Sequence, residues 1–217
     1  MALQPSLAPL VIMGDRNAPH TLDVFLDYVC PFSKKLATTL DQVVKPLLAE
    51  GGEYAGKAKV IFRNHPQPWH ASSTFVHEAS LALVRIAPLK FWAFSLALFD
   101  HQDDYFDQPT SKLTPDAIRN KLADLAVNAL VIGKDDRQGF LDLLTPSSTP
   151  NGGVAVTDDL KYTMTSPVLI PYIPVKFGRQ NGIHVSPTVL LDGLVANEIS
   201  SSWDEGKWKD FFASKLV

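Results

Sequence analysis

The stretch TLDVFLDYVCPFSKK (residues 21–35) joins a strand-like segment to the only cysteine of the chain, Cys30. Residues 21–29 are rich in β-branched and aromatic side chains with little polar alternation, which is typical of a strand buried on both faces. Residues 33–50 then place hydrophobic side chains at helical spacing, and two glycines end the pattern. The sequence therefore predicts a strand, a cysteine and a helix, in that order.

A second strand is predicted over residues 58–64, AKVIFRN, and completes a β-α-β unit. Strands that are joined through a helix run parallel, so we expect a parallel pair here. Residues 74–144 follow with several segments of helical periodicity. Within them, Thr114 and Pro115 are typical of a helix start, with a hydroxyl at the cap and proline in the first turn.

The last part of the chain again alternates strand and helix signals. VSPTVLLDG (residues 185–193) predicts a strand and a turn, with a second hairpin strand within residues 195–200. Ser202 and Glu205 have the spacing of a capping box ahead of an amphipathic, aromatic-rich helix. The order of elements is strand-helix-strand, a helical block, and strand-hairpin-helix.

Three segments resemble DsbA-like thioredoxin-fold proteins. Residues 14–35 resemble the family's start, in which a Gly-x-x-x-Ala-Pro lead enters the first strand and ends at Cys-Pro-x-Cys. Residues 60–73 resemble its second strand and following turn, and residues 182–193 its Gly-x-x-x-x-Pro-Thr signature. The resemblance implies an α/β protein with a thioredoxin fold and a helical insertion.

This resemblance also implies a division of the chain. We expect residues 14–70 and 180–217 to form a discontinuous thioredoxin-like core, residues 71–179 the helical insertion, and residues 1–13 an N-terminal extension. Two positions depart from the family pattern. Ser33 stands in place of the resolving cysteine, and Val24, six residues before Cys30, replaces a buried acid that many thioredoxin-fold enzymes keep.

Cys30 is the candidate nucleophile. At the start of a helix, unpaired N–H groups and the positive end of the helix dipole favour a thiolate. The alternative is that Cys30 is a small buried hydrophobic residue. Ser33 lies one turn later, where its hydroxyl either donates to the thiolate or satisfies a backbone donor. Because no second thiol is present, an external thiol must resolve any mixed disulfide, and glutathione is the candidate.

The candidate binding groove follows from the resemblance. It implies a cis Ser186–Pro187 bond beside the thiol, which leaves the backbone of Val185 or Ser186 free to pair with an extended thiol ligand. The alternative is an ordinary proline at the start of a strand. We expect Pro31 and Phe32 to line the groove on the side of the thiol.

Other motifs have simpler interpretations. His65, His70 and His77 lack a thiolate or carboxylate at metal-site spacing, so we expect no metal. His65 and His70 are expected in the turn after the second strand, and His77 on a solvated helix face. FWAF (residues 91–94) is expected in the core of the insertion, and DHQDDYFD (residues 100–107) as a solvated loop.

Composition limits the classes of partner and location. The chain of 217 residues has a formal net charge of −3, which gives no electrostatic footprint for nucleic acid or an anionic membrane. The N-terminus lacks the basic lead of a secretory signal, and no apolar segment is long enough to span a bilayer. A single cysteine excludes an internal disulfide and agrees with a reducing compartment. The expected location is the cytoplasm.

Two functional hypotheses result. In the first, the protein is a monothiol thiol-disulfide oxidoreductase or glutathione-linked transferase that works through Cys30. Its partner is then a small thiol or thiol-containing protein, with glutathione as cosubstrate and no tightly bound cofactor. In the second, it is a non-catalytic thioredoxin-fold binding module with a vestigial cysteine. The fixed φ of Pro31 disfavours an iron-sulfur scaffold. Neither hypothesis specifies an oligomeric state.

Overall fold

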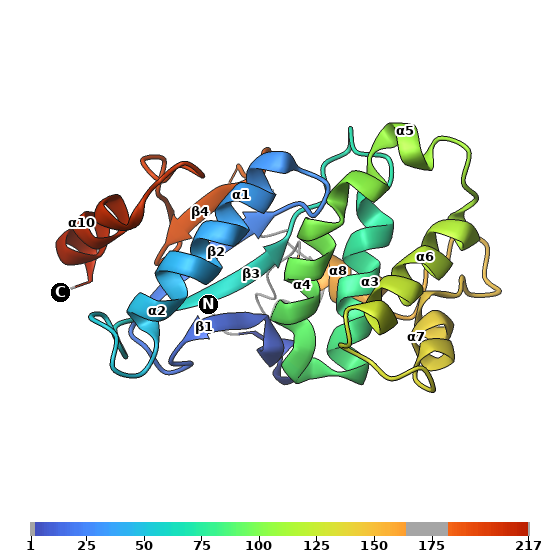
Figure 1. Cartoon of the computed structure of the whole chain (residues 1–217), viewed down its shortest axis with the longest axis horizontal. Helices are drawn as coiled ribbons and strands as arrows, with labels where there is room; N and C mark the ends of the chain where they lie inside the picture. Colours follow the sequence, from blue (N-terminus) through green and yellow to red (C-terminus); the bar gives the residue numbers. More distant parts are fainter. Residues whose placement is uncertain (1–2, 164–181, 217) are drawn as a thin grey trace, which may run out of the picture.

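The computed structural model describes residues 3–163 and 182–216 and is built around a mixed sheet (Figure 1). The strand order is β1-β3-β2-β4-β5. β2 and β3 are parallel, as the β-α-β pattern predicts, and the other neighbouring pairs are antiparallel. The strands are β1 Val11–Gly14, β2 His20–Leu26, β3 Ala58–Asn64, β4 Thr188–Leu191 and β5 Leu194–Val195.

Two predicted strands differ from the observed ones in length. The first ends at Leu26 rather than at residue 29, because the chain turns immediately and the Cys30 N–H donates to the Asp27 carbonyl at 3.0 Å. The second hairpin strand stops at Val195. The Ile199 N–H donates to the Ala196 carbonyl at 3.1 Å, so the chain is already turning where the sequence pattern predicted a strand.

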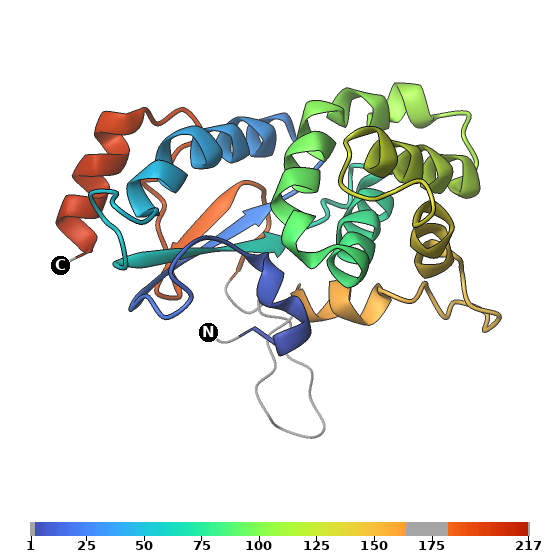
Figure 2. The same ribbon diagram turned by 60° about the horizontal axis from the view of Figure 1, so that its bottom comes forward.

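The helix after the cysteine is divided into three pieces. α1 spans Pro31–Thr39, a π-helical turn spans Leu40–Val44, and α2 spans Lys45–Leu48. Pro46 has no N–H for a helical hydrogen bond and its ring would crowd the preceding turn, so the widened turn accommodates it. Figure 2 shows α1, α2 and the C-terminal helix α10 on one face of the sheet.

The C-terminal helix α10, Glu205–Lys215, does not start with the predicted capping box. Asp204 is its N-cap, and the Asp204 carboxylate accepts from the Lys207 N–H at 2.9 Å. The Ser202 hydroxyl instead lies 2.9 Å from the Ser200 hydroxyl. An ionised acid at the cap is the stronger acceptor and also favours the positive end of the helix dipole.

The helical insertion lies at one end of the sheet (Figure 1). The predicted start of α6 is confirmed, because the Thr114 hydroxyl accepts from the Ala117 N–H at 3.2 Å. Short 3-10 segments occur at Pro5–Leu10, Pro88–Lys90 and Gln102–Tyr105. The insertion helices are α3 Ser73–Ile86, α4 Phe91–Asp100, α5 Asp107–Thr110, α6 Pro115–Asn128, α7 Arg137–Leu144 and α8 Thr157–Thr163.

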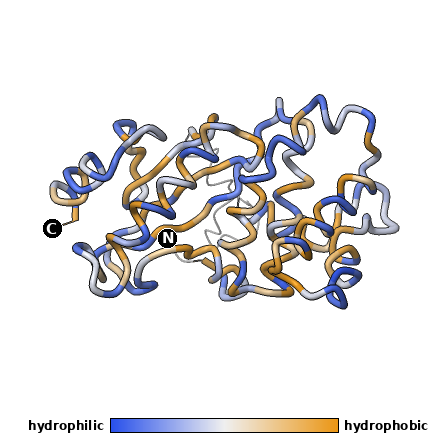
Figure 3. Tube along the Cα trace, in the orientation of Figure 1, coloured by the Kyte–Doolittle hydropathy of each residue, from blue (hydrophilic) through white to orange (hydrophobic). Residues whose placement is uncertain are grey.

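One hydrophobic core joins the sheet to the insertion (Figure 3). Tyr28 stacks on Phe62 with ring centroids 5.2 Å apart, and Phe62 meets Phe91 edge-on at 5.6 Å. Phe91 and Phe94 are buried, which confirms the predicted core position of this cluster. The insertion is therefore anchored on the sheet beside the end of β2.

The predicted domain boundaries remain predictions. β1 begins at Val11, inside the range 1–13 expected to be an extension, and the boundary at 179/180 lies outside the described residues.

Candidate active site

Cys30 is the N-cap residue of α1. Its backbone is extended (φ −90°, ψ 121°), Pro31 occupies the first helical position, and the Lys34 N–H donates to the Cys30 carbonyl at 3.1 Å. The side chain is only 6% exposed. This places the thiol at the end of the helix where backbone N–H groups are unpaired, as the sequence predicts.

The cis-proline loop lies against the thiol. The Ser186–Pro187 peptide bond is cis, which confirms the expectation from the resemblance. The Cys30 thiol lies 3.4 Å from the Ser186 carbonyl oxygen and donates to it. The fold thus brings together two segments that are 156 residues apart in the sequence.

Ser33 is fully buried behind the thiol. Its hydroxyl accepts from the Asp27 N–H at 3.2 Å, which is the structural role that the sequence left open. This hydrogen bond ties the segment before the helix, at Asp27, to the first turn of α1, at Ser33. A role of Ser33 as a donor to the thiolate remains a prediction.

The backbone of the cis-proline loop has partners within the protein. In one orientation of the Gln67 amide, both its oxygen and its nitrogen have hydrogen-bond partners. The oxygen then accepts from the Ser186 N–H at 2.7 Å, and the nitrogen donates to the His184 carbonyl at 3.2 Å. The Val185 carbonyl accepts from the Thr188 hydroxyl at 2.8 Å. A ligand that pairs with the backbone at Ser186 must therefore displace Gln67.

An apolar pocket of 390 Å³ opens beside Cys30. Val29 and Pro31, the two neighbours of the cysteine, line one side, and His70 lines another. The insertion supplies the remaining wall, which consists of Phe106, Asp107, Gln108 and Pro109. The insertion thus completes a groove that the thioredoxin-like elements alone would leave open.

Large hydrophobic side chains are exposed on the segments that form the site. Phe32 is 65% exposed at the start of α1, and Val185 precedes the cis-proline loop. Trp69 is also exposed and stacks edge-on against His70. Exposed aromatic residues near a pocket are typical of surfaces that bind apolar ligands or polypeptide.

The sequence interpretation missed a buried carboxylate three residues before the cysteine. Asp27 is fully buried, and both of its oxygens are engaged. Oδ1 accepts from the Val29 N–H at 3.1 Å and the Ser73 hydroxyl at 2.6 Å, while Oδ2 accepts from the Gln67 N–H at 3.1 Å and His70 Nδ1 at 2.6 Å. Four donors surround a single carboxylate beneath the turn that carries Cys30.

His77 is part of this cluster, so its predicted position on a solvated helix face is wrong. His77 is fully buried on α3, with Nδ1 2.7 Å from the Asn64 side-chain oxygen and Nε2 3.4 Å from Asp27 Oδ1. The helix packs against other insertion helices, and His77 faces Asn64 at the end of β3. The buried acid provides the reason for a buried histidine.

The comparisons with solved structures identify the fold. No protein-family model and no curated protein matches the chain. Solved structures do match. A candidate protein-disulfide isomerase from Pseudomonas syringae is 25% identical, with a TM-score of 0.63 over 93% of this chain and 97% of that chain. The thiol-disulfide exchange protein alpha-DsbA2 from Wolbachia pipientis is 18% identical, with a TM-score of 0.59 over 93% and 84%.

BdbD from Bacillus subtilis, in its oxidised form, is 21% identical, with a TM-score of 0.56 over 98% of this chain and 96% of that chain. The chain has the DsbA-like thioredoxin fold.

Within this DsbA-like fold, the buried acid lies in an unexpected place. Val24 is buried in β2 between Phe62 of β3 and Val189 of β4, so the position six residues before the cysteine is part of the hydrophobic core. Asp27 instead places a carboxylate after the strand has ended. A short acidic residue three positions before Cys-Pro, followed by histidines after the next strand, is the sequence signal for this arrangement.

The charge state of this cluster follows from burial and hydrogen bonding. Burial alone would raise the pKa of Asp27, but contacts from His77, Ser73 and His70 outweigh it and hold the pKa well below its ordinary value. Burial lowers the pKa of His77, although Asp27 opposes the shift. Asp27 is therefore ionised, and the His77 imidazole is neutral at neutral pH.

His65, at the end of β3, should make the fold sensitive to mild acid. Burial, with the neighbouring His77 and His184, lowers the pKa of His65 to about 4 against the opposing charge of Asp27. The unfolded chain binds a proton at this residue below about pH 6.5, whereas the folded chain does so only near pH 4. The free energy of unfolding should therefore fall as pH falls between these values.

His65→Gln should reduce the loss of unfolding free energy between about pH 7 and pH 5 by about 1–2 kcal/mol, measured by denaturant unfolding at the two pH values. His20→Gln, at a partly exposed histidine, serves as the control for the loss of an imidazole. An unchanged pH dependence in His65→Gln would contradict the assignment.

The acidic segment at residues 100–107 is not the solvated loop that the sequence predicts. It forms a 3-10 turn in which Gln102 and Tyr105 are buried. The Gln102 side chain donates to the Tyr28 carbonyl at 2.9 Å and to the Cys30 carbonyl at 3.3 Å. The insertion therefore fixes the backbone of the cysteine turn directly.

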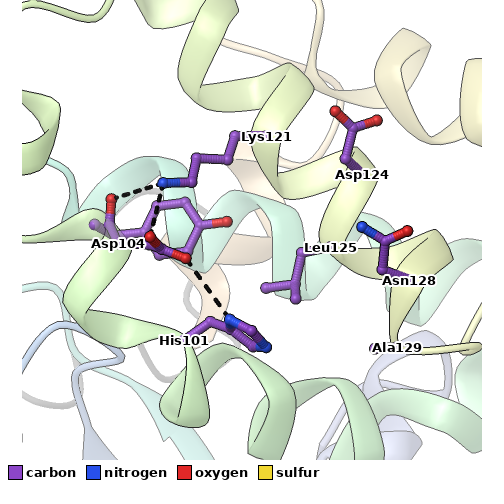
Figure 4. Close-up of a pocket in the computed structure, with 8 residues that line it drawn as sticks. His101, Asp104, Lys121, Asp124, Leu125, Asn128 and Ala129 are labelled. Carbon is purple, nitrogen blue, oxygen red and sulfur yellow. Dashed lines mark hydrogen bonds and ion pairs between the residues drawn. The ribbon is translucent and has the colours of Figure 1, made fainter.

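A second pocket, of 280 Å³, lies between this 3-10 turn and α6 (Figure 4). Its charges are paired with one another. Lys121 lies 3.0 Å from Asp104 Oδ1, and His101 lies 3.6 Å from Asp104 Oδ2. Neither Cys30 nor its sequence neighbours line this pocket, whereas Val29 and Pro31 line the apolar pocket, so we place the candidate active site at the apolar pocket.

Over residues 3–163 and 182–216, no group of three potential metal ligands is found, and no helix is long and apolar enough to cross a membrane.

Proposed function

We propose that this protein is a thiol-disulfide oxidoreductase that works through the single thiol of Cys30. One observation supports it above all: the thiol lies at the start of α1 and 3.4 Å from the carbonyl of the residue before the cis-proline. Two of the similar structures are those of a thiol-disulfide exchange protein and a candidate protein-disulfide isomerase. The adjoining apolar pocket suits a disulfide carried on a small molecule or a protein.

The reaction has two exchange steps. In the first, the Cys30 thiolate attacks one sulfur of a disulfide RS–SR′. A Cys30–SR bond forms, the S–S bond breaks, and R′S⁻ leaves and takes up a proton. In the second, an external thiol attacks the mixed disulfide, forms a new disulfide with the SR group, and releases the Cys30 thiolate. Electrons pass from the external thiol to the original disulfide.

We propose glutathione as the external thiol. Ser33 has no sulfur with which to resolve the mixed disulfide, and the chain contains no other cysteine. A compact thiol tripeptide would reach the pocket past the exposed Phe32 more readily than a protein thiol. This dependence on a small reducing thiol fits the cytoplasm, which we propose as the location.

A steady-state assay tests this proposal. The wild type should remove glutathione from a glutathionylated peptide in the presence of reduced glutathione. Its kinetics should be ping-pong, because Cys30 carries the glutathionyl group between two half-reactions. A lack of turnover, or kinetics that require both substrates to bind together, would contradict the proposed function.

The non-catalytic binding module has specific support as well. Cys30 is only 6% exposed, and the Ser186 N–H is already bonded to Gln67. In that case the pocket would bind a ligand without a covalent step. Calorimetry with glutathione distinguishes the two, because binding without turnover supports the module.

Ser33→Cys should create a dithiol site. The new thiol would lie one helical turn from Cys30, on the same face, where it can attack a mixed disulfide. We expect insulin reduction by dithiothreitol to rise at least about tenfold over an almost inactive wild type.

Ser33→Ala is the matched control, since it also removes the acceptor for the Asp27 N–H but adds no sulfur. Equal gains in both variants, or wild-type activity as high as that of Ser33→Cys, would contradict the monothiol assignment.

A further inference from the structure

We infer that His70 is the proton donor and acceptor for the thiol chemistry of Cys30, held in position by the buried Asp27. This inference rests on the proposed function and names a second catalytic residue for it. The pair has the features of an acid-base catalyst, namely an imidazole at a pocket and a carboxylate behind it.

The carboxylate fixes the imidazole tautomer. His70 Nδ1 lies 2.6 Å from Asp27 Oδ2. Because Asp27 is ionised, Nδ1 carries the ring proton and forms an N–H hydrogen bond to the carboxylate. Nε2 is left with a free lone pair and is the atom that can accept a proton from a thiol. This is how a buried acid prepares a histidine for proton transfer.

His70 also has access to solvent and to the pocket. Its side chain is 21% exposed, whereas His77, the other histidine beside Asp27, is fully buried. His70 lines the 390 Å³ pocket together with Val29 and Pro31, the residues on either side of Cys30. A disulfide in this pocket therefore lies against the imidazole and against the two sequence neighbours of Cys30.

The segment that carries His70 is fixed by its own hydrogen bonds. The His70 N–H donates to the Gln67 carbonyl at 3.1 Å, and the Ser73 N–H donates to the His70 carbonyl at 3.0 Å. Gln67 in turn donates its N–H to Asp27. The turn is thus wrapped around the carboxylate, so the imidazole is held in place before any substrate arrives.

The proton balance of the first half-reaction is complete. Nε2 of His70 takes the proton of the Cys30 thiol, which leaves a thiolate and an imidazolium. The thiolate attacks the disulfide RS–SR′ and forms the Cys30–SR bond. The departing R′S⁻ takes the proton back from Nε2. In the second half-reaction, Nε2 removes the proton of the incoming thiol and returns it to Cys30.

Among the described residues, two carboxylates and a second histidine lie around the imidazole. Asp27 and His77 lie behind it, and Asp107 lines the far side of the same pocket. His77 is buried and cannot reach a ligand. Asp107 is exposed on the insertion and is the competing source of a proton.

The test compares two disulfides that need the proton to different degrees. An aromatic disulfide releases a stable thiolate that needs no acid, whereas oxidised glutathione releases a basic thiolate that leaves faster when it is protonated. The rate of mixed-disulfide formation at Cys30 is measured under single-turnover conditions. His70→Gln should slow both reactions, because Cys30 loses its base, and should slow the reaction with oxidised glutathione at least about tenfold more than that with the aromatic disulfide, because the basic leaving thiolate also loses its acid.

Two controls accompany this variant. His20→Gln breaks a histidine-aspartate pair of similar geometry at the other end of β2, where His20 Nδ1 lies 2.7 Å from Asp192 Oδ2, and should change neither rate. Asp107→Asn tests the competing acid and should not reproduce the selective loss with oxidised glutathione. Imidazole added to His70→Ala should restore part of the lost rate even if the substitution loosens the turn.

The outcomes separate this inference from the proposed function. If His70→Gln slows both disulfides equally or neither, or if Asp107→Asn shows the selective loss, the role of His70 is refuted while the function of Cys30 stands. A wild type that reacts with neither disulfide would refute the proposed function and this inference with it.

Discussion

Replacing Cys30 with serine should abolish glutathione removal from a glutathionylated peptide, with a loss of at least about a thousandfold to the uncatalysed rate. Serine keeps the size and the polar contact with the Ser186 carbonyl but has no nucleophilic sulfur. Steady-state rates with reduced glutathione measure the effect. Thermal unfolding of the same samples checks that the fold is intact.

The cysteine variant also separates catalysis from binding. Cys30→Ser should still bind glutathione in calorimetry, because the pocket and the cis-proline loop are unchanged. Equal turnover by the wild type and Cys30→Ser would show that this thiol is not the nucleophile, and the binding module would then be the better description.

Asp27→Asn should lower the free energy of unfolding by about 3–5 kcal/mol at neutral pH. The carboxylate accepts from four donors in the interior, and the amide of asparagine turns one acceptor into a donor that faces them. A loss of this size is a large part of the total stability of a domain. Denaturant unfolding measures it.

The effect of this substitution should depend on pH. Because the pKa of Asp27 is lowered in the folded state, its stabilisation is complete above about pH 4 and is lost as pH falls further. The difference between wild type and Asp27→Asn should therefore shrink in acid. Asp192→Asn, at an exposed histidine-aspartate pair, should cost only about 1 kcal/mol. Equal costs for the two substitutions would contradict the assigned role of Asp27.

The sequence predicts the fold well because its signals are local. The buried strand before Cys30, the strand over residues 58–64 and the start of α6 each depend on neighbouring residues, and the structure confirms them. The strand ends and the cap of α10 are less well predicted, because turns and competing acceptors within a few residues decide them.

The supporting residues of the site could not be predicted in the same way. Asp27 is stable in the interior only because donors arrive from residues 67–77, and nothing in a linear pattern shows that these residues meet. The same holds for His77, which periodicity alone places on either face of its helix. Gln102 reaches the Cys30 carbonyl from the insertion, across 72 residues of sequence.

The central claim is that the fold activates Cys30. Intact mass spectrometry after incubation with oxidised glutathione tests it most directly, since the chain has one cysteine and can form only one adduct. We predict one adduct on the native chain, removed by reduced glutathione, that forms at least about tenfold faster at neutral pH than on the same chain unfolded in urea. A native chain that is modified more slowly than the unfolded chain, or not at all, would contradict the account.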